Sequence, residues 1–215
     1  NTSLLKNPEN AKNLLSVGAS QDTPNQGNFC SGGAGPTVDG RRKPEVFLPG
    51  CNTISARSST ACSTIGLTGT SMASPAVAGS AALVRQYFTD GYYPTGAEVP
   101  SDAFTPSGAL VKAALINSTV DMTGIAGFPS NGEGWGRILL NNTLFFTGEN
   151  DRLIVRDIRN ASGLSTGQNN ALAFNVASAG PGLRITMVFV DPPASATTGS
   201  GAAWINDLDL EVVAP

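Results

Sequence analysis

Residues 68–79 read TGTSMASPAVAG and join a short polar run to an alanine-rich apolar segment. Ser71 lies at the junction, two residues after Gly69 and four before Pro75. Small and apolar residues fill most of positions 72–84, which predicts a helix over about residues 71–88 that is apolar all round and therefore buried on all sides. A serine in the first turn of such a helix lies where backbone N–H groups lack helical partners and the helix dipole is positive.

Ser71 has two interpretations. As a nucleophile it would need a neighbouring base to take its proton, and an N–H at the helix start could then stabilise the oxyanion formed on an attacked carbonyl. The chain contains no histidine, so the most common base is absent. The alternative is a serine that caps a buried helix. The partial match of residues 69–73 to the pattern G-x-S-x-G does not separate the two interpretations.

The composition favours a compact, loop-rich globular protein. The 215 residues carry a net charge of −3, 13% are charged, and there are 25 glycines and 14 prolines. This balance gives no basic surface for nucleic acid, and the short run at residues 41–43 is interpreted as a solvated loop. The most apolar window, residues 72–84, is too short and interrupted for a membrane span of about 18 apolar residues. The chain starts at Asn1 without a signal peptide, so we expect a fragment or a processed product.

The three cysteines, Cys30, Cys51 and Cys62, leave two alternatives open. Cys51 and Cys62 flank a predicted hairpin, and a disulfide between them is one interpretation. Buried free thiols are the other. Because the chain has no histidine and no Cys-x-x-Cys spacing, the sequence argues against a zinc site.

The pattern before residue 148 predicts short strands and two helices. Buried strands are expected at 14–17 and 45–48, and a hairpin at 53–57 and 64–68. A second helix is expected to begin at Thr105-Pro106, with Thr105 as N-cap and Pro106 at the first helical position, and to end near Asn117. Residues 22–36, rich in glycine, asparagine and proline, are expected to form a loop.

After residue 148 the pattern changes to short apolar or alternating runs separated by turn residues. We therefore predict two domains. Residues 1–148 form an α/β unit with a parallel sheet and a buried central helix, and residues 149–215 form part of an all-β sandwich or jelly roll. The strands expected in the second domain are 153–158, 171–176, 183–190 and 208–213. Four strands make a thin sandwich with open edges, so this domain is also expected to be incomplete.

Several motifs follow one another in an order typical of one enzyme family. In chain order they are Asn10-Ala11-Lys12-Asn13, Val17-Gly18-Ala19, Gly35-Pro36-Thr37, Asp39-Gly40-Arg41, Lys43-Pro44-Glu45, Pro49-Gly50, residues 69–79 and Gly134-Trp135-Gly136-Arg137-Ile138. This set resembles the C-terminal half of the catalytic domain of the subtilisin-like serine proteases (subtilases, peptidase S8). Further along, Val190-Asp191-Pro192 and Asn206-Asp207-Leu208-Asp209-Leu210 resemble the β-sandwich of the KP-43-type alkaline proteases.

The resemblance implies that Ser71 is the nucleophile of a serine endopeptidase that hydrolyses peptide bonds through an acyl-enzyme. It also implies that Gly66, Leu67, Thr68 and Thr70 contact the polypeptide substrate, the first three on the leaving-group side. In the family, the catalytic Asp and His and the oxyanion Asn precede the motifs seen here. The missing N-terminal half of the catalytic domain would then be a required partner. No cofactor would be needed for the chemistry, and the protein would be secreted.

An acidic segment near the end of the chain has two interpretations. Asp207, Asp209 and Glu211 alternate with apolar residues, so on a strand they would share one face at a spacing of about 6.5 Å. Carboxylate oxygens are typical calcium ligands, and proteases that resemble this chain often bind structural calcium, which would make Asp207 and Asp209 metal ligands. The alternative is a polar face turned to solvent.

Two functions other than proteolysis remain open at this point. The absence of histidine is compatible with a complete but inactive relative that acts as a binding or scaffold module. The predicted sandwich could also bind a carbohydrate or a protein, although it contains few aromatic side chains (Phe174, Phe189 and Trp204). We favour the protease fragment because Ser71 retains the whole surrounding motif.

Overall fold

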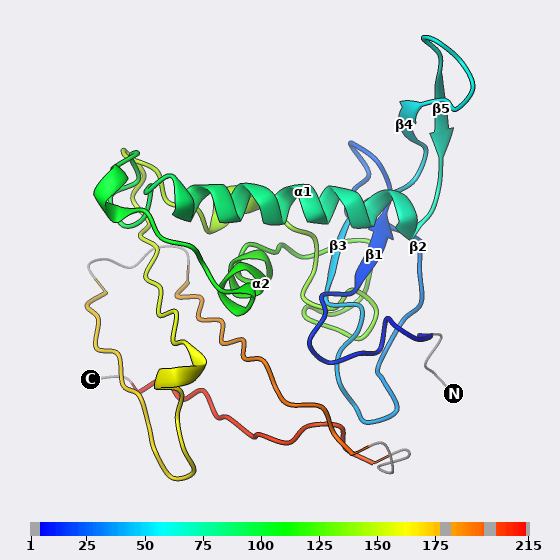
Figure 1. Ribbon diagram of the computed structural model, residues 1–215. Coiled ribbons are helices and arrows are strands. Elements are labelled where there is room, and N and C mark those ends of the chain that lie inside the picture. Colours follow the sequence, from blue (N-terminus) through cyan, green and yellow to red (C-terminus); the bar gives the residue numbers. More distant parts are fainter. Residues whose placement is uncertain (1–4, 177–181, 196–200, 214–215) are drawn as a thin grey trace.

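One long helix crosses the molecule, and the strands gather at its N-terminal end. The computed structural model describes residues 5–176, 182–195 and 201–213. Helix α1 (Thr70–Thr89) has 20 residues, and the shorter α2 (Gly108–Asn117) lies beneath it (Figure 1). Three short 3-10 turns are η1 (Pro100–Asp102), η2 (Leu140–Asn142) and η3 (Asn160–Ser162).

A three-stranded mixed sheet packs against the start of α1. Its central strand β1 (Val17–Ser20) runs parallel to β3 (Val46–Pro49) and antiparallel to β2 (Phe29–Ser31). Val17 lies beside Val46, and the pairing with β2 is irregular between Ala19 and Ser20. The parallel β1–β3 pair confirms part of the predicted parallel sheet, whereas β2 lies in a segment predicted to be a loop.

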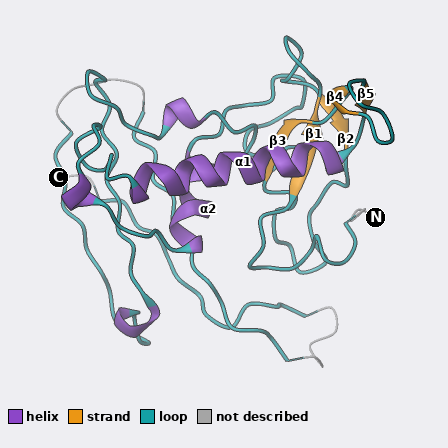
Figure 2. Cartoon of the chain, turned by 45° about the horizontal axis from the view of Figure 1, so that its top comes forward, coloured by secondary structure: helices purple, strands orange, loops and turns teal. Residues whose placement is uncertain are grey.

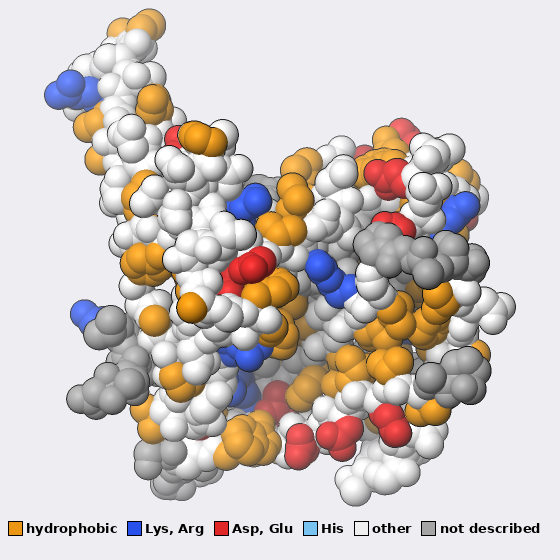
Figure 3. Space-filling model, turned by 180° about the vertical axis from the view of Figure 1, so that it is seen from behind, with side chains coloured by type: hydrophobic (Ala, Val, Ile, Leu, Met, Phe, Trp, Pro, Cys, Tyr) orange, Lys and Arg blue, Asp and Glu red, His pale blue; other side chains and the backbone are white. Residues whose placement is uncertain are grey.

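A two-stranded hairpin leads directly into α1. Strands β4 (Thr53–Ala56) and β5 (Thr64–Leu67) pair antiparallel, with Thr53 opposite Leu67. The hairpin stands out from the body as an arm (Figures 1 and 3). Its position and pairing confirm the hairpin expected from the sequence.

The hydrophobic core lies between α1, the sheet and α2. One face of α1 supplies the buried residues Ala73, Val77, Val84, Tyr87 and Phe88. They pack with residues of β3, of α2 and of the segment that follows, among them Val46, Leu115, Ile138 and Leu144. Figure 2 shows α1 running from the strands to the far side of the molecule.

The opposite face of α1 corrects one prediction, because the helix is not buried on all sides. Pro75, Ala78 and Ala82 are exposed, and Leu83 is 56% exposed. The described residues cover only the face that meets the sheet and α2. Hydrophobic side chains also lie open across the rear of the molecule (Figure 3). The helix therefore has more apolar surface than the described part of the chain buries.

Two element boundaries differ from the prediction for identifiable reasons. β1 spans Val17–Ser20 and not residues 14–17, so it runs on through Gly18. It starts late because polar side chains engage the preceding backbone: the Ser16 N–H donates to Glu45 Oε2 at 2.6 Å, and Lys43 Nζ donates to the Leu14 carbonyl at 3.1 Å. α2 is capped by Ser107, not Thr105. The Ser107 hydroxyl accepts the Leu110 N–H at 3.0 Å.

The predicted sandwich is not confirmed. In the described residues after position 148, the segments 153–158, 171–176, 183–190 and 208–213 form no strand. In Figure 1 they run as long irregular segments down the left side and along the lower part of the molecule. Some contact the rest of the chain: Arg184 donates to the carbonyls of Asn117 and Thr119 at 2.6 and 2.7 Å. No helix in the described part of the chain has the length and apolar character needed to cross a membrane.

Candidate active site

Gly69 sets the path by which the chain enters α1. Its φ of 152° and ψ of 169° lie where residues with a side chain rarely occur. The Gly69 N–H donates to the Gly50 carbonyl at 2.8 Å, and the Gly69 carbonyl accepts the Met72 N–H at 3.0 Å. A Cβ atom at Gly50 would lie 2.7 Å from the Gly69 oxygen and 3.1 Å from the Ala73 Cβ. The two glycines therefore permit a close backbone contact directly before Ser71.

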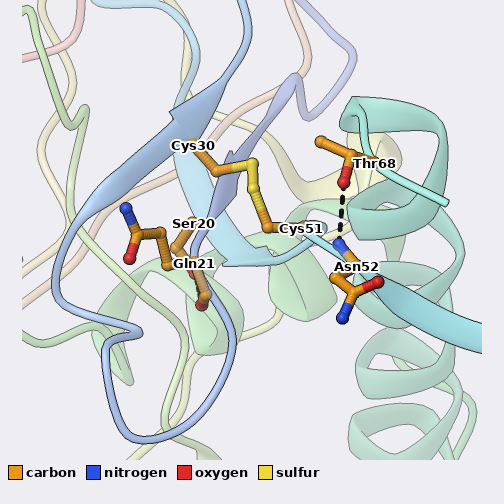
Figure 4. Close-up of a disulfide and its surroundings, with 6 residues drawn as sticks. All are labelled: Ser20, Gln21, Cys30, Cys51, Asn52 and Thr68. Atoms are coloured by element: carbon orange, nitrogen blue, oxygen red, sulfur yellow. Dashed lines mark hydrogen bonds between the residues drawn. A yellow bond between two sulfur atoms is a disulfide. The ribbon is translucent and has the colours of Figure 1, made fainter. Parts of the chain in front are cut away.

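A disulfide holds the segment on which this turn rests. Cys30 in β2 is bonded to Cys51, which follows β3 (Figure 4). Next to it, the Asn52 N–H donates to Thr68 Oγ1 at 2.8 Å. The Cys51–Cys62 pairing and the buried free thiols were both wrong, because the unpredicted β2 brings Cys30 to the end of β3, while Cys62 lies in the hairpin loop as an exposed free thiol.

Ser71 is exposed in the first turn of α1. Gly69, not Ser71, occupies the N-cap position, and no side chain caps the helix. Within the described residues, the Ser71 hydroxyl makes no hydrogen bond and its N–H makes no bond to the preceding backbone. A free hydroxyl beside a free N–H at the positive end of a long helix suits a nucleophile with an oxyanion donor. No base among the described residues is hydrogen-bonded to this hydroxyl.

Ser71 lines a pocket of about 410 Å³. The pocket also touches Thr70 and Ser74 of the same helix turn, Ser16 before β1, Gly32 after β2, and Glu9 near the start of the chain. Gly32 packs closely, since a Cβ atom there would lie 3.2 Å from Thr70 Cγ2. Segments that are distant in sequence thus form one cavity around the serine.

Of the residues expected to contact substrate, only Thr70 lines this pocket. Gly66 and Leu67 belong to β5 on the hairpin, and Leu67 is 47% exposed. Gly66 lies against Asn52, whose Oδ1 would be 2.4 Å from a Cβ atom at Gly66. Thr68 is engaged by the Asn52 N–H. Gly66 and Leu67 therefore lie on the hairpin, and Thr68 lies on the segment that joins the hairpin to Ser71.

A buried ion cluster supports one wall of the pocket. The Glu45 carboxylate binds Lys43 at 2.5 Å and Lys112 at 2.8 Å, and its Oε2 also accepts the Ser16 hydroxyl at 2.8 Å. Burial lowers the pKa of Lys43, although Glu45 opposes this effect. The Lys43-Pro44-Glu45 motif contributed to the family resemblance, but its sequence alone did not indicate that it fixes Ser16.

The acidic segment shows no metal cluster. Asp207 and Asp209 are exposed, and no three His, Cys, Asp or Glu side chains in the described residues gather to hold a metal ion. The engaged carboxylate is Asp191, which accepts the N–H groups of Ile205 and Asn206 at 2.8 and 2.9 Å. Lys12 Nζ binds Asp191 Oδ2 at 2.5 Å and also the carbonyls of Pro192 and Ala203. An ammonium group thus lies among these oxygens.

A family model identifies the family of this chain, and several known proteins are similar to it. The model of the subtilase family (Peptidase_S8) matches residues 1–136. Two Dictyostelium discoideum proteins, named serine protease/ABC transporter B family proteins tagD and tagB, are 31% and 33% identical to this chain. Each alignment covers 86% of this chain but only 13% and 12% of those proteins.

Two further matches are shorter or more distant. The serine protease AprX of Bacillus subtilis is 35% identical over 105 residues, which are 40% of this chain and 23% of AprX. Among solved structures, the Clostridium perfringens CspB protease has a TM-score of 0.48 and 24% identity, covering 64% of this chain and 27% of that one. The chain therefore spans a small part of the length of the relatives that it matches.

Proposed function

Because this chain belongs to the subtilase family, we propose that it carries the nucleophile of a serine endopeptidase. Ser71 would attack a peptide carbonyl, expel the amine and form an acyl-enzyme that water then hydrolyses. The observation that carries the proposal is the exposed Ser71, with a free hydroxyl and a free N–H, at the start of α1 and inside a pocket. That N–H would donate to the developing oxyanion.

The remaining catalytic groups would come from polypeptide outside these 215 residues. The chain has no histidine, so we propose that the His base, its Asp and the oxyanion Asn belong to an N-terminal half of the same catalytic domain. The open apolar face of α1 supports this arrangement, since such a surface needs a cover. Gly66, Leu67 and Thr68 would border the substrate on the leaving-group side, and Thr70 would contact it within the pocket.

We further propose that residues 149–215 begin a β-sandwich of the KP-43 type. Their segments lack strand partners among the described residues, and backbone groups left unpaired need partners.

Secretion is supported by the Cys30–Cys51 disulfide, because disulfides persist in oxidising compartments. No cofactor is needed for the chemistry. Calcium at Asp207 and Asp209 would be structural and would require further oxygen ligands. A calcium titration that leaves the melting temperature of the protein unchanged would rule out this calcium site.

The test uses the whole protein from which the chain comes, with a labelled polypeptide substrate and a fluorophosphonate that modifies active serines. Ser71→Ala is expected to abolish labelling and to lower hydrolysis by at least about 10³-fold, because the nucleophile is lost. Ser80→Ala is the matched control: its hydroxyl lies on the same helix and binds only the Ala76 carbonyl, at 3.0 Å. It should leave both readouts unchanged.

The competing interpretation is an inactive binding or scaffold module, which the absence of histidine favours. If the whole protein neither hydrolyses the substrate nor takes up the fluorophosphonate, that interpretation replaces ours. Hydrolysis that survives Ser71→Ala would equally refute the role of Ser71.

A further inference from the structure

The pocket beside Ser71 contains a single charged side chain. Among the residues that line it, only Glu9 is ionisable. Glu9 is exposed, and its Oε2 accepts the backbone N–H of Lys6 at 3.0 Å. Within the described part of the chain it forms no ion pair. Its negative charge is therefore available to a ligand in the same cavity as the nucleophile.

The charged groups that lie behind Ser16 are already paired. Glu45 lies behind Ser16, but Lys43 and Lys112 bind its carboxylate. Both ammonium groups also donate to the Leu14 carbonyl, at 3.1 and 2.9 Å. None of these three charged residues lines the pocket. Among the described residues, Glu9 is thus the one charged residue that lines the pocket.

The rest of the wall combines apolar side chains with serine and threonine hydroxyl groups. The apolar part is formed by Leu5, Pro8, Leu14, Leu15 and Pro44. Apolar surface beside one carboxylate matches the side chains of lysine and arginine, whose methylene stems pack on apolar surface while the charged head binds an anion. A neutral side chain of the same length would contact the apolar surface but would form no ion pair with Glu9. An acidic side chain would be repelled by Glu9.

We propose that Glu9 makes this pocket selective for a lysine or arginine side chain of the polypeptide substrate, at the residue that precedes the scissile bond. The inference rests on the proposed function, since it names the substrate class of the same site. Glu9 acts as a specificity-determining residue: it holds the cationic head and thereby places the scissile carbonyl near Ser71.

The test uses the whole protein and peptides that differ only at the residue before the scissile bond: lysine, neutral norleucine or glutamate. Two quantities are measured, kcat/KM with the unmodified protein and Kd with the Ser71→Ala variant, which binds without cleaving. We expect the lysine peptide to exceed the norleucine peptide by about tenfold in both, which corresponds to about 1.4 kcal/mol. The glutamate peptide should be the poorest.

Substitutions then assign the preference to Glu9. Glu9→Gln should abolish the advantage of the lysine peptide while changing the norleucine peptide little, and Glu9→Lys should favour the glutamate peptide. Glu98→Gln makes the same charge change at an exposed position outside the pocket and should preserve the preference. Because Glu9 is exposed, we expect all variants to keep the melting temperature of the unmodified protein.

The outcomes separate this inference from the proposed function. Cleavage with equal kcat/KM for the lysine and norleucine peptides, or a preference that survives Glu9→Gln, overturns the inference and leaves the protease intact. If no peptide is cleaved, the proposed function fails, and the Kd values decide: a lysine preference lost in Glu9→Gln supports the inference, and equal Kd values overturn it.

Discussion

Gly69 shapes the turn that places Ser71 at the start of α1. Its φ of 152° is rarely open to residues with a side chain, and its N–H and carbonyl bond to Gly50 and Met72. We predict that Gly69→Ala lowers the free energy of unfolding by about 1–3 kcal/mol, since the strained conformation must be kept or the turn must move. Moving the turn would displace Ser71 and reduce fluorophosphonate labelling. Urea denaturation and labelling of the whole protein measure the two effects.

Gly108→Ala is the matched control. Gly108 opens helix α2, away from the turn before Ser71, and a Cβ atom there would meet nothing within 4 Å. Because alanine is the better helix former, this change should raise the free energy of unfolding by about 0.5–1 kcal/mol. If both substitutions shift stability by similar amounts in the same direction, the special role of Gly69 is wrong.

At the residue scale the sequence indicated Ser71 but not Glu9. Ser71 lies in a contiguous motif whose helix start and family resemblance can be read locally. Glu9 gains its place only because segments near residues 5–9, 14–17, 32–33 and 70–74 meet in one pocket. A local sequence pattern does not indicate that these distant segments form one pocket.

Among the elements, the disulfide between β2 and the end of β3 supports the turn before α1. It closes a loop with a sequence separation of 21 residues. A crosslink of this span stabilises a fold by about 3 kcal/mol, chiefly by restricting the unfolded chain. We predict that Cys51→Ser lowers the free energy of unfolding of the whole protein by about this amount. A reducing agent should then have no further effect through this bond.

Cys62→Ser provides the comparison for the disulfide prediction. Its thiol is free and exposed, so the substitution should leave the unfolding curve unchanged in urea. A loss of stability as large as that of Cys51→Ser would mean that Cys62 takes part in the structural crosslink, contrary to the pairing described here.

The elements were predicted best where local pattern decides them. The hairpin and α1 match their predicted ranges to within about one residue at each end. β1 starts later because Glu45 and Lys43, far along the chain, engage the backbone of residues 14–16. β2 has only three residues, and α2 takes its cap from Ser107, which Asp157 holds at 2.5 Å. Side chains from distant segments set these boundaries, and the local sequence pattern carries no information about such contacts.

At the scale of the whole molecule, Asp191 ties the C-terminal segments to the start of the chain. It binds Lys12 and the N–H groups of residues 205 and 206, and its backbone pairs with the Asn13 side chain. Burial raises the pKa of Asp191, but the hydrogen bonds from Lys12 and the two N–H groups outweigh it and lower the pKa to about 2. The folded molecule therefore favours the ionised carboxylate.

This pKa predicts an acid-sensitive attachment. Because the folded value lies below the ordinary 3.8, the stabilisation is fully present above about pH 4 and is lost as the pH falls through about 2. Hydrogen exchange of the Ile205 and Asn206 amides, which donate to Asp191, should report release of the segment over that range in the whole protein. Asp191→Asn should release it already at neutral pH, whereas Asp151→Asn, at an exposed position, should behave like the parent. Amide protection that is unchanged in Asp191→Asn would contradict the attachment.

The division of the chain near residue 148 rests on a change of sequence pattern, and the described residues beyond it do not confirm the predicted sandwich. A strand needs a neighbouring edge for its backbone groups, and the described segments after residue 148 provide none to one another. The same reasoning applies to the open face of α1. In both places the sequence pattern predicts a surface that packs against a partner, and the described residues do not include that partner.

Reading the coding sequence immediately upstream of Asn1 tests most directly whether Ser71 is the nucleophile of a protease. We predict an open reading frame there that encodes an Asp motif, a His motif and an oxyanion Asn motif, in that order, so that Ser71 gains its base and its second oxyanion donor. A start codon at that point would leave Ser71 with nothing to activate it. The protease would then give way to a binding or scaffold module.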